Sequence, residues 1–521
     1  MKSDFKNCLF LLVLFVVGLS AKADNIGKDS IGLTIDGTVV MAESQSFTHR
    51  IDGLFVNPEL DYMLLKFRDT TKSGKRLKSK GEIGAFSLKD SKLLWTIPLD
   101  YNVSTVCCLK SGVIVSNGKD VSMLNSATGA VRWQGKFVPV QYDDSTNVVL
   151  GYPSDGSSKL SGYDLNTGDK LWTVSLSHSK NWGWDRVIRE DSVHWLIVAD
   201  ELNRLNIRTG EAYVYDAKTG VTDVKGAILQ GLAMGVLAVG SGMAFGYTPY
   251  PVGKISPNVI NHLHSNVVQD DSLYYFADRE RVACLDSSMN TVWSYEFPSK
   301  TSAFSQLVHN DSTLYMLNLG YGLRGGHQPM KMGRPFIAAF DKRTGACHYM
   351  NMLSLKKDIV EHALLDTDGA FMLFDDGLAY KHELSDSTVT ISPWNVSEYG
   401  RLWSIVNWPV YALDSQKNVF DVIASDGFHF PVITAKGDIF LVDKELNVST
   451  SYPANSLYWP ICMVGDRMCV YSRSSGVQDV WLVSLQGIPE IKLTIPIHGV
   501  RIARGKLFLY NNKGLYYLPL E

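Results

Sequence analysis

The sequence predicts an all-β protein built from repeated four-stranded antiparallel units, and three observations support this prediction. The 521-residue chain is rich in glycine (43), tyrosine (24) and tryptophan (12), a composition that favours strands and turns. A short motif recurs with a period near 40 residues. Around it lie short segments with the alternating pattern typical of strands, such as residues 113–115, 121–124 and 131–133. One such unit cannot bury both of its faces alone, so the units are expected to stack into a ring, a β-propeller.

The repeated motif has the form Asp-x-x-Thr-Gly-x-x-x-Trp. Its tryptophans are separated by 38 and 39 residues in the first three copies, and later copies are looser. A period of this length with strand-type patterning is typical of propellers. The residues that define the repeat are Trp95, Trp133, Trp172, Asp164, Thr167, Gly168, Asp341, Thr344 and Gly345.

The chemistry of the motif explains its residues. Thr-Gly supplies a turn that needs a left-handed glycine, and the Asp side chain can accept hydrogen bonds from the amides of that turn. The tryptophan then buries a large ring against the neighbouring unit. Trp95, Trp133 and Trp172 are therefore expected at equivalent positions on the outer strands of successive blades.

We predict eight blades, because propellers usually have four to eight. Seven are clear in the sequence, two further candidates follow, and residues 499–520 are expected to close the ring with the N-terminal strand 32–42. The predicted positions are 46–100, 103–137, 138–176, 184–217, 259–297, 302–350, 358–392, 418–453 and 456–497.

Residues 1–23 read as a signal peptide. Lys2 and Lys6 precede an apolar run that is too short to span a bilayer, and Ala21 and Ala23 form a small-x-small cleavage signal. We expect residues 24–521 to be a single propeller domain that is periplasmic or secreted, with no transmembrane crossing. The net charge of −3 argues against a nucleic-acid binder.

Three insertions interrupt the repeats, at about residues 66–81, 219–257 and 320–335. In a four-stranded meander all three fall on the face opposite the Thr-Gly turns. The first and third are basic, which favours either a solvated loop or contact with an anionic partner. The residues of the candidate interaction face are Lys72, Lys75, Arg76, Lys78, Lys80, Arg324, Lys331 and Arg334.

The second insertion contains an uncharged stretch, residues 226–247. It is long enough to span a membrane, but a single crossing would place blades on opposite sides of the bilayer. Three interpretations stay open: an apolar hairpin packed over the face, a membrane-dipping segment, or a partner-binding patch.

The cysteines and histidines suggest candidate disulfides and a candidate metal site. Cys462 and Cys469 flank a likely hairpin turn and could form a disulfide or remain two thiols, and the adjacent pair Cys107-Cys108 is open in the same way. His262 and His264 are two residues apart on a predicted strand, so both face one way. They could hold a metal, but no third ligand is visible, so we predict no metal site.

The repeat resembles that of the quinoprotein (pyrroloquinoline-quinone) dehydrogenase-like propellers, clearly over residues 50–350 and weakly over 351–521. That superfamily also contains non-enzymatic members, including the periplasmic scaffold of the outer-membrane barrel assembly machine. The resemblance implies that Cys107-Cys108 could cover a quinone, as an adjacent-cysteine disulfide does in the dehydrogenases. Matching calcium ligands and a catalytic aspartate are not found, so we expect Cys107 and Cys108 to be small buried cysteines instead.

Taken with the resemblance, these features predict an exported, non-enzymatic propeller without a cofactor. We expect it to be a binding or scaffolding module of the bacterial cell envelope, whose partner is an envelope protein or the membrane surface. The alternatives are a quinone-dependent dehydrogenase and a sugar-polymer-binding propeller, the latter because Trp182, Trp184 and Trp195 and a second tryptophan group at 394, 403 and 408 could stack on sugars.

Overall fold

Residues 23–519 of this chain are described by a computed structural model, with the following positions left out: 58, 155–156, 177–183, 223–258, 327, 354–358, 366–368, 375–377, 386–387, 396–401, 406–409, 414–419, 424–428, 435–438, 444–445, 453–456, 465, 473–479 and 513. The signal-peptide prediction therefore lies outside the described residues, apart from Ala23 at the start of the first strand.

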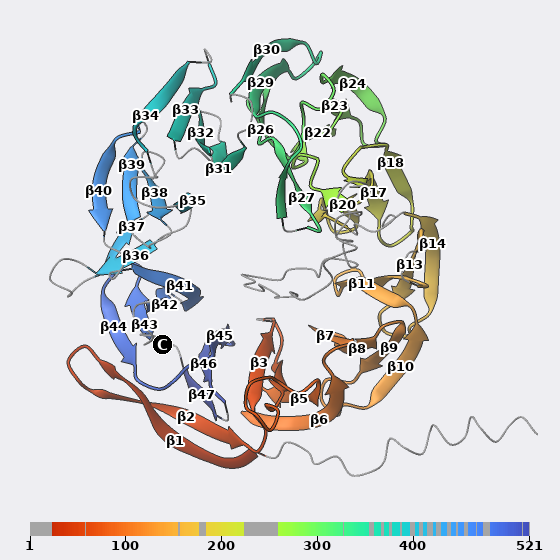
Figure 1. Ribbon diagram of the computed structural model, residues 1–521. Helices are drawn as coiled ribbons and strands as arrows, with labels where there is room; N and C mark the ends of the chain where they lie inside the picture. Colours follow the sequence, from red (N-terminus) through yellow and green to blue (C-terminus); the bar gives the residue numbers. More distant parts are fainter. Residues whose placement is uncertain are drawn as a thin grey trace, which may run out of the picture.

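The described chain is all-β and forms a ring of four-stranded antiparallel blades around a central axis (Figure 1). The predicted fold class is thus confirmed. Each blade is a meander whose first strand in sequence lies nearest the axis and whose last strand lies at the rim.

Eight separate sheets make up most of the ring. Their strands are β3 (Ile51–Val56), β4 (Tyr62–Phe67), β5 (Lys80–Ser87), β6 (Lys92–Asp100); β7 (Ser104–Leu109), β8 (Gly112–Asn117), β9 (Asp120–Leu124), β10 (Val131–Lys136); β11 (Val138–Asp143), β12 (Val148–Tyr152), β13 (Lys159–Asp164), β14 (Lys170–Ser175); β15 (Arg186–Arg189), β16 (His194–Val198), β17 (Leu202–Asn206), β18 (Ala212–Tyr215); β21 (Val268–Asp270), β22 (Leu273–Ala277), β23 (Arg281–Leu285), β24 (Thr291–Glu296); β25 (Ser305–His309), β26 (Thr313–Asn318), β29 (Phe336–Asp341), β30 (Cys347–Met352); β31 (Val360–Leu365), β32 (Gly369–Phe374), β33 (Leu378–Glu383), β34 (Val389–Asn395); and β35 (Leu402–Ile405), β38 (His429–Thr434), β39 (Ile439–Asp443), β40 (Val448–Tyr452).

An eleven-stranded sheet closes the ring and contains two further four-stranded units. One unit is β41 (Leu457–Val464), β42 (Arg467–Ser472), β43 (Val480–Ser484) and β44 (Pro489–Leu493). The other is β45 (Gly499–Ala503), β46 (Lys506–Tyr510), β47 (Gly514–Pro519) and the N-terminal β2 (Val39–Phe47). The hairpin of β36 (Val410–Leu413) and β37 (Phe420–Ile423) extends the sheet beside β41.

The described residues therefore contain ten four-stranded units in the ring, which corrects the predicted count of eight. The predicted positions had already included these units, and the lower number came from the usual size of propellers. The ring is closed where β3 packs beside β45. Strand β1 (Ala23–Thr34) pairs with both β2 and β44, so it joins the rims of the last two units.

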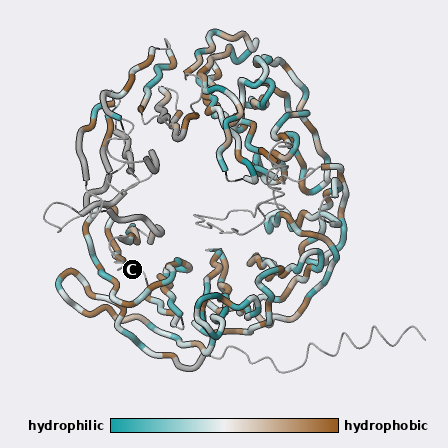
Figure 2. The backbone as a smooth tube through the Cα atoms, in the orientation of Figure 1, coloured by the Kyte–Doolittle hydropathy of each residue, from teal (hydrophilic) through white to brown (hydrophobic). Residues whose placement is uncertain are grey.

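The core lies between the faces of successive blades. In one interface Trp195 and Ile197 of β16 pack on Leu150 and Tyr152 of β12, and all four are buried. The same arrangement recurs around the ring. Figure 2 shows the corresponding apolar and polar residues interspersed along the strands. Each blade is thus stabilised by its neighbours, because both of its faces are apolar.

The Thr-Gly turns have the geometry that their residues require. The carboxylate of Asp164 accepts hydrogen bonds from the amides of Asn166 and Thr167 at 2.7 and 2.9 Å. Gly168 has a φ of 79°, in the left-handed region. In the later copy, Asp341 accepts from the Thr344 amide at 2.7 Å and Gly345 has a φ of 74°. The hydrogen bonds that stabilise each of these two turns therefore come from the residues of the turn itself.

The outer-strand tryptophans link each blade to the next turn. The indole N–H of Trp133 donates to the carbonyl of Leu165 at 2.9 Å, one residue after Asp164. A side chain on Gly168 would begin 2.8 Å from the same indole, so glycine is needed there for contact as well as for φ. The equivalent bonds are Trp95 to Ser126 at 2.7 Å, Trp172 to Ile207 at 3.0 Å, Trp293 to Lys342 at 2.8 Å and Tyr349 to Leu384 at 3.0 Å.

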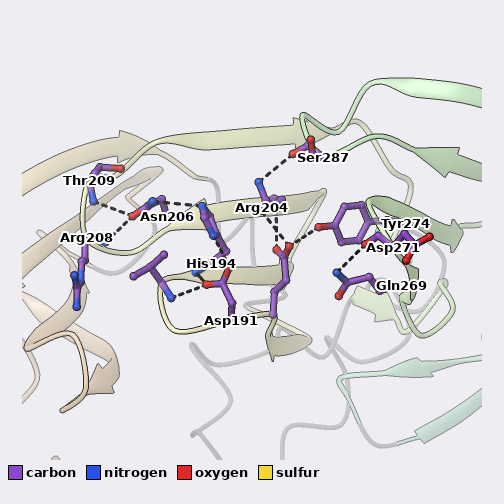
Figure 3. A network of polar contacts seen from close by, with 12 residues as sticks. Asp191, His194, Arg204, Asn206, Arg208, Thr209, Gln269, Asp271, Tyr274 and Ser287 are labelled. Atoms are coloured by element: carbon purple, nitrogen blue, oxygen red, sulfur yellow. Dashed lines mark hydrogen bonds and ion pairs between the residues drawn. The ribbon is translucent and has the colours of Figure 1, made fainter.

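In one blade, a charged side chain replaces the aromatic one that contacts the next turn. The blade β15–β18 has Val214 where the motif has tryptophan, and Val214 is exposed. Here Arg204 donates to the carbonyl of Ser287 at 3.2 Å, the position after Asp286 that tryptophan contacts elsewhere. Arg204 also forms a two-point ion pair with the buried Glu190, at 2.7 and 3.0 Å, and Tyr274 of the next blade donates to the same carboxylate (Figure 3). An arginine therefore replaces the indole as the interblade donor.

Candidate functional site

Strand order places the described ends of the three insertions on one side of the ring. Residues 66–80 connect β4 to β5 and residues 320–335 connect β26 to β29, so both join the second and third strands of a blade. Residues 216–267 connect the last strand of one blade to the first strand of the next. In a meander these connections lie opposite the Thr-Gly turns. We call this side the insertion face and the other side the turn face.

The second and third insertions are joined by hydrogen bonds. A small sheet forms from β19 (Val221–Thr222), β20 (Val259–Asn261), β27 (Tyr321–Arg324) and β28 (Gln328–Lys331), in that order. Strand β20 pairs with β27, and the Gly325 amide donates to the carbonyl of Val259 at 2.8 Å. Figure 1 shows β20 and β27 inside the ring of blades. The apolar stretch 226–247 lies outside the described residues.

The first insertion is a compact basic hairpin. The Thr71 amide donates to the carbonyl of Arg76 at 2.7 Å, and Thr70 forms a bridge with Leu77. Its base is held by Asp69, which accepts from the Arg50 amide at 3.0 Å and contacts His49 at 2.9 Å. Burial tends to raise the pKa of Asp69, but these bonds outweigh burial and lower it.

The cations of this hairpin divide into two groups. Lys66 and Arg68 lie over the ring of Tyr101, and Lys66 also pairs with Asp52 at 2.8 Å. The remaining five are exposed: Lys72, Lys75, Arg76, Lys78 and Lys80. Lys78 is 3.8 Å from Asp69, a separation that contributes little at the surface. The exposed group thus presents its charge to solvent on the insertion face.

The third insertion contributes fewer exposed charges. Lys331 and Arg334 are exposed, whereas Arg324 is half-buried in the small sheet. The Arg334 amide donates to the carbonyl of Thr301 at 3.0 Å, which fixes the end of the hairpin. His327, in the same loop, lies outside the described residues.

A cluster of two histidines and one aspartate lies between two blades. Asp185 precedes β15, and His262 and His264 lie between β20 and β21. One carboxylate oxygen of Asp185 is 2.7 Å from Nδ1 of His262, and the other is 2.6 Å from Nε2 of His264. The first contact is close but lacks good hydrogen-bond geometry, because Nδ1 of His262 has no aligned partner. All three ligand atoms lie within 4.8 Å of one another.

The sequence interpretation that no third ligand accompanies the two histidines is corrected by Asp185, which stands 79 positions before His264. Only the packing of neighbouring blades brings Asp185 close to the two histidines, so the spacing of these residues in the sequence does not indicate the contact. Burial would raise the pKa of Asp185, but its close contacts with both histidines outweigh burial and hold the pKa well below its usual range. Side-chain exposure is 6% for Asp185, 2% for His264 and 29% for His262.

The adjacent cysteines point to opposite faces of β7. Cys108 packs with Val113 in one interblade cluster, and Cys107 packs beside Ile114 in the next. Burial raises the pKa of the Cys108 thiol to about 11. This environment is that of small core residues. Cys462 and Cys469 lie directly opposite each other across β41 and β42, the predicted hairpin register.

The tryptophans proposed for sugar stacking are partly described. Trp184 and Trp195 are 5% and 1% exposed and pack in the same interblade cluster. Trp182 and Trp408 lie outside the described residues, as do the side chains of Trp394 and Trp403. Trp184 and Trp195 therefore belong to the core.

The described residues contain no helix with the length and apolarity needed to cross a bilayer.

Comparisons with known proteins agree with the repeat. Residues 73–295 match the family described as outer membrane protein assembly factor BamB. No curated protein matches the chain. Among solved structures, BamB from Moraxella catarrhalis is 14% identical over 85% of this chain and 98% of that one, with a TM-score of 0.32. The computationally designed Ika8 protein is 10% identical over 75% of this chain and 96% of that one, with a TM-score of 0.31. With their Thr-Gly turns and outer-strand tryptophans, residues 73–295 are thus similar to the BamB-like family of PQQ-type propeller repeats.

Proposed function

We propose that this chain is an exported, non-enzymatic propeller that acts as a binding or scaffolding module in the bacterial cell envelope. The observation that carries the proposal is the concentration of inserted segments on one face. Five exposed cations lie within nine residues of one hairpin, and two other insertions pair in a sheet on the same side. The match of residues 73–295 to an outer membrane assembly factor supports the envelope as the compartment.

The chemistry of this face favours an anionic partner. Clustered surface cations raise the local concentration of anionic groups and speed encounter, while adding little to affinity individually. At physiological salt the Debye length is about 8 Å, so such binding weakens as salt is added. The partner is an envelope protein with an acidic surface, or the anionic membrane itself, and one experiment separates the two.

The experiment compares charge-neutralised variants on the two faces. The first replaces the five exposed cations of the basic hairpin with glutamine: Lys72, Lys75, Arg76, Lys78 and Lys80. The control removes the same charge from exposed positions on or beside the turn face: Lys89, Lys92, Lys170, Arg208 and Arg343. Both are tested for capture of envelope proteins from detergent extracts and for co-sedimentation with phosphatidylglycerol vesicles, at low and high salt.

We expect the hairpin variant to lose salt-dependent capture of an envelope protein, and the control to keep it. Loss of vesicle binding alone would identify the membrane as the partner. Equal behaviour of the two variants, or capture that ignores salt, would contradict the assignment of the insertion face as the binding surface.

A further inference from the structure

In the cluster of Asp185, His262 and His264, both ring nitrogens of His264 face oxygen atoms. Nδ1 of His264 lies 2.7 Å from the carbonyl oxygen of Ser265, and Nε2 lies 2.6 Å from Asp185. A carbonyl oxygen and an ionised carboxylate can only accept hydrogen bonds. A neutral imidazole has a proton on just one nitrogen, so one of these contacts would set a lone pair against an oxygen. The contact between Nε2 and Asp185 therefore requires a proton or a metal ion between the two atoms.

The surroundings of the cluster suit a metal ion. Histidines that bind metals usually donate the second ring nitrogen to a carbonyl or carboxylate, as Nδ1 of His264 does to Ser265. The ring of His264 stacks on Phe276 with centroids 5.7 Å apart, and the ring of His262 lies 5.5 Å from Phe304. These aromatic walls limit the positions that the imidazoles can take.

The backbone at His262 is also unusual. Its φ is 59°, a left-handed conformation that non-glycine residues rarely adopt. Such conformations persist where the surroundings impose them and are frequent at ligand sites. Here the conformation brings Nδ1 of His262 within 2.7 Å of Asp185, although the two residues belong to connections of different blades.

We propose that Asp185, His262 and His264 bind one divalent transition-metal ion, with zinc as the preferred class and water in the remaining position. Two imidazoles and one carboxylate are a common three-residue ligand set for zinc with an open fourth position. Around tetrahedral zinc, ligand atoms are about 3.3 Å apart, given metal–ligand distances of about 2.0–2.2 Å. The two shortest contacts, 2.6 and 2.7 Å, must therefore widen by less than about 1 Å as the ion displaces the protons.

A bound ion would tie two parts of the insertion face together. Asp185 enters the blade of β15, while His262 follows β20 of the small sheet that joins the second and third insertions. The ion would thus fix that sheet to the ring. This inference does not depend on the proposed partner, because it concerns binding of the ion alone.

The test titrates the purified, metal-stripped full chain with zinc alone and with Co²⁺ as a spectroscopic probe. Variants are His262→Ala, at the more exposed ligand, and Asp185→Asn. The control is His194→Ala, which removes another histidine paired with an aspartate, Asp191, at 2.8 Å on the turn face. Circular dichroism checks that each variant remains folded.

We expect one zinc per wild-type chain, a rise in melting temperature with zinc, and the visible absorption of tetrahedral Co²⁺ that zinc abolishes. His262→Ala and Asp185→Asn should each weaken zinc binding by at least about tenfold, the lower end of what loss of even an outer-shell partner costs. The control should bind as the wild type does. Failure of the wild type to bind either ion, or equal binding by all variants, would overturn the proposal and leave the cluster as a buried ion pair.

Discussion

Replacing Trp133 by alanine should strongly lower the free energy of unfolding, because this indole connects its blade to the turn of the next blade. The side chain is 8% exposed, lies against Gly168 of the next turn and donates to Leu165 at 2.9 Å. Loss of a buried tryptophan costs about 3–5 kcal/mol. The hydrogen bond accounts for about 1 kcal/mol of this. Trp133→Phe should therefore fall between alanine and wild type.

The measurement is urea unfolding followed by far-ultraviolet circular dichroism, which does not depend on the tryptophan signal. Val131→Ala on the same strand is the control, since Val131 is 52% exposed and should change the free energy of unfolding by no more than about 0.5 kcal/mol. A cost below about 1 kcal/mol for Trp133→Ala, or an equal cost for Val131→Ala, would refute the argument that the indole joins the blades.

Two further predictions concern buried polar groups. Arg204→Ala should cost about 3 kcal/mol in the same unfolding assay, because the side chain of Glu190, which is 8% exposed, would lose its partner. Adding Glu190→Gln to this variant should recover part of the loss. Additive effects of the two substitutions would count against a shared ion pair. Since burial raises the pKa of Cys108 to about 11, only about a thousandth of that thiol is ionised at pH 8, so alkylation measured by mass spectrometry should be far slower in the native than in the urea-unfolded protein. Labelling of Cys108 at the unfolded rate would show that the thiol is accessible and ionised in the folded state.

Local chemistry explains why the blade type was predictable. The turn at Asp164 needs only residues within five positions of one another, and the same holds for Asp341. The register of Cys462 with Cys469 follows from one tight hairpin. The number of blades was harder to predict, because the last units lack the motif and share one eleven-stranded sheet with the N-terminal strands β1 and β2.

The candidate sites show the same division. The basic hairpin was visible in the sequence because its five exposed cations lie within nine residues, and meander topology assigned its face. The partner of His262 and His264 was not visible, because Asp185 belongs to the connection into another blade. The replacement of tryptophan by Arg204 was also hidden, since Val214 in the motif position gives no hint of the donor that contacts Ser287.

The sequence by itself determined the repeat, the turn chemistry and the apolar faces that require blades to stack, because these depend on residues close along the chain. Tertiary structure alone decided that ten four-stranded units close the ring, that β20 pairs with β27, and that Asp185 contacts two histidines. These depend on which faces and edges meet when the ring closes. Contacts of that kind leave no periodic signal, since each occurs once and joins segments far apart in the chain.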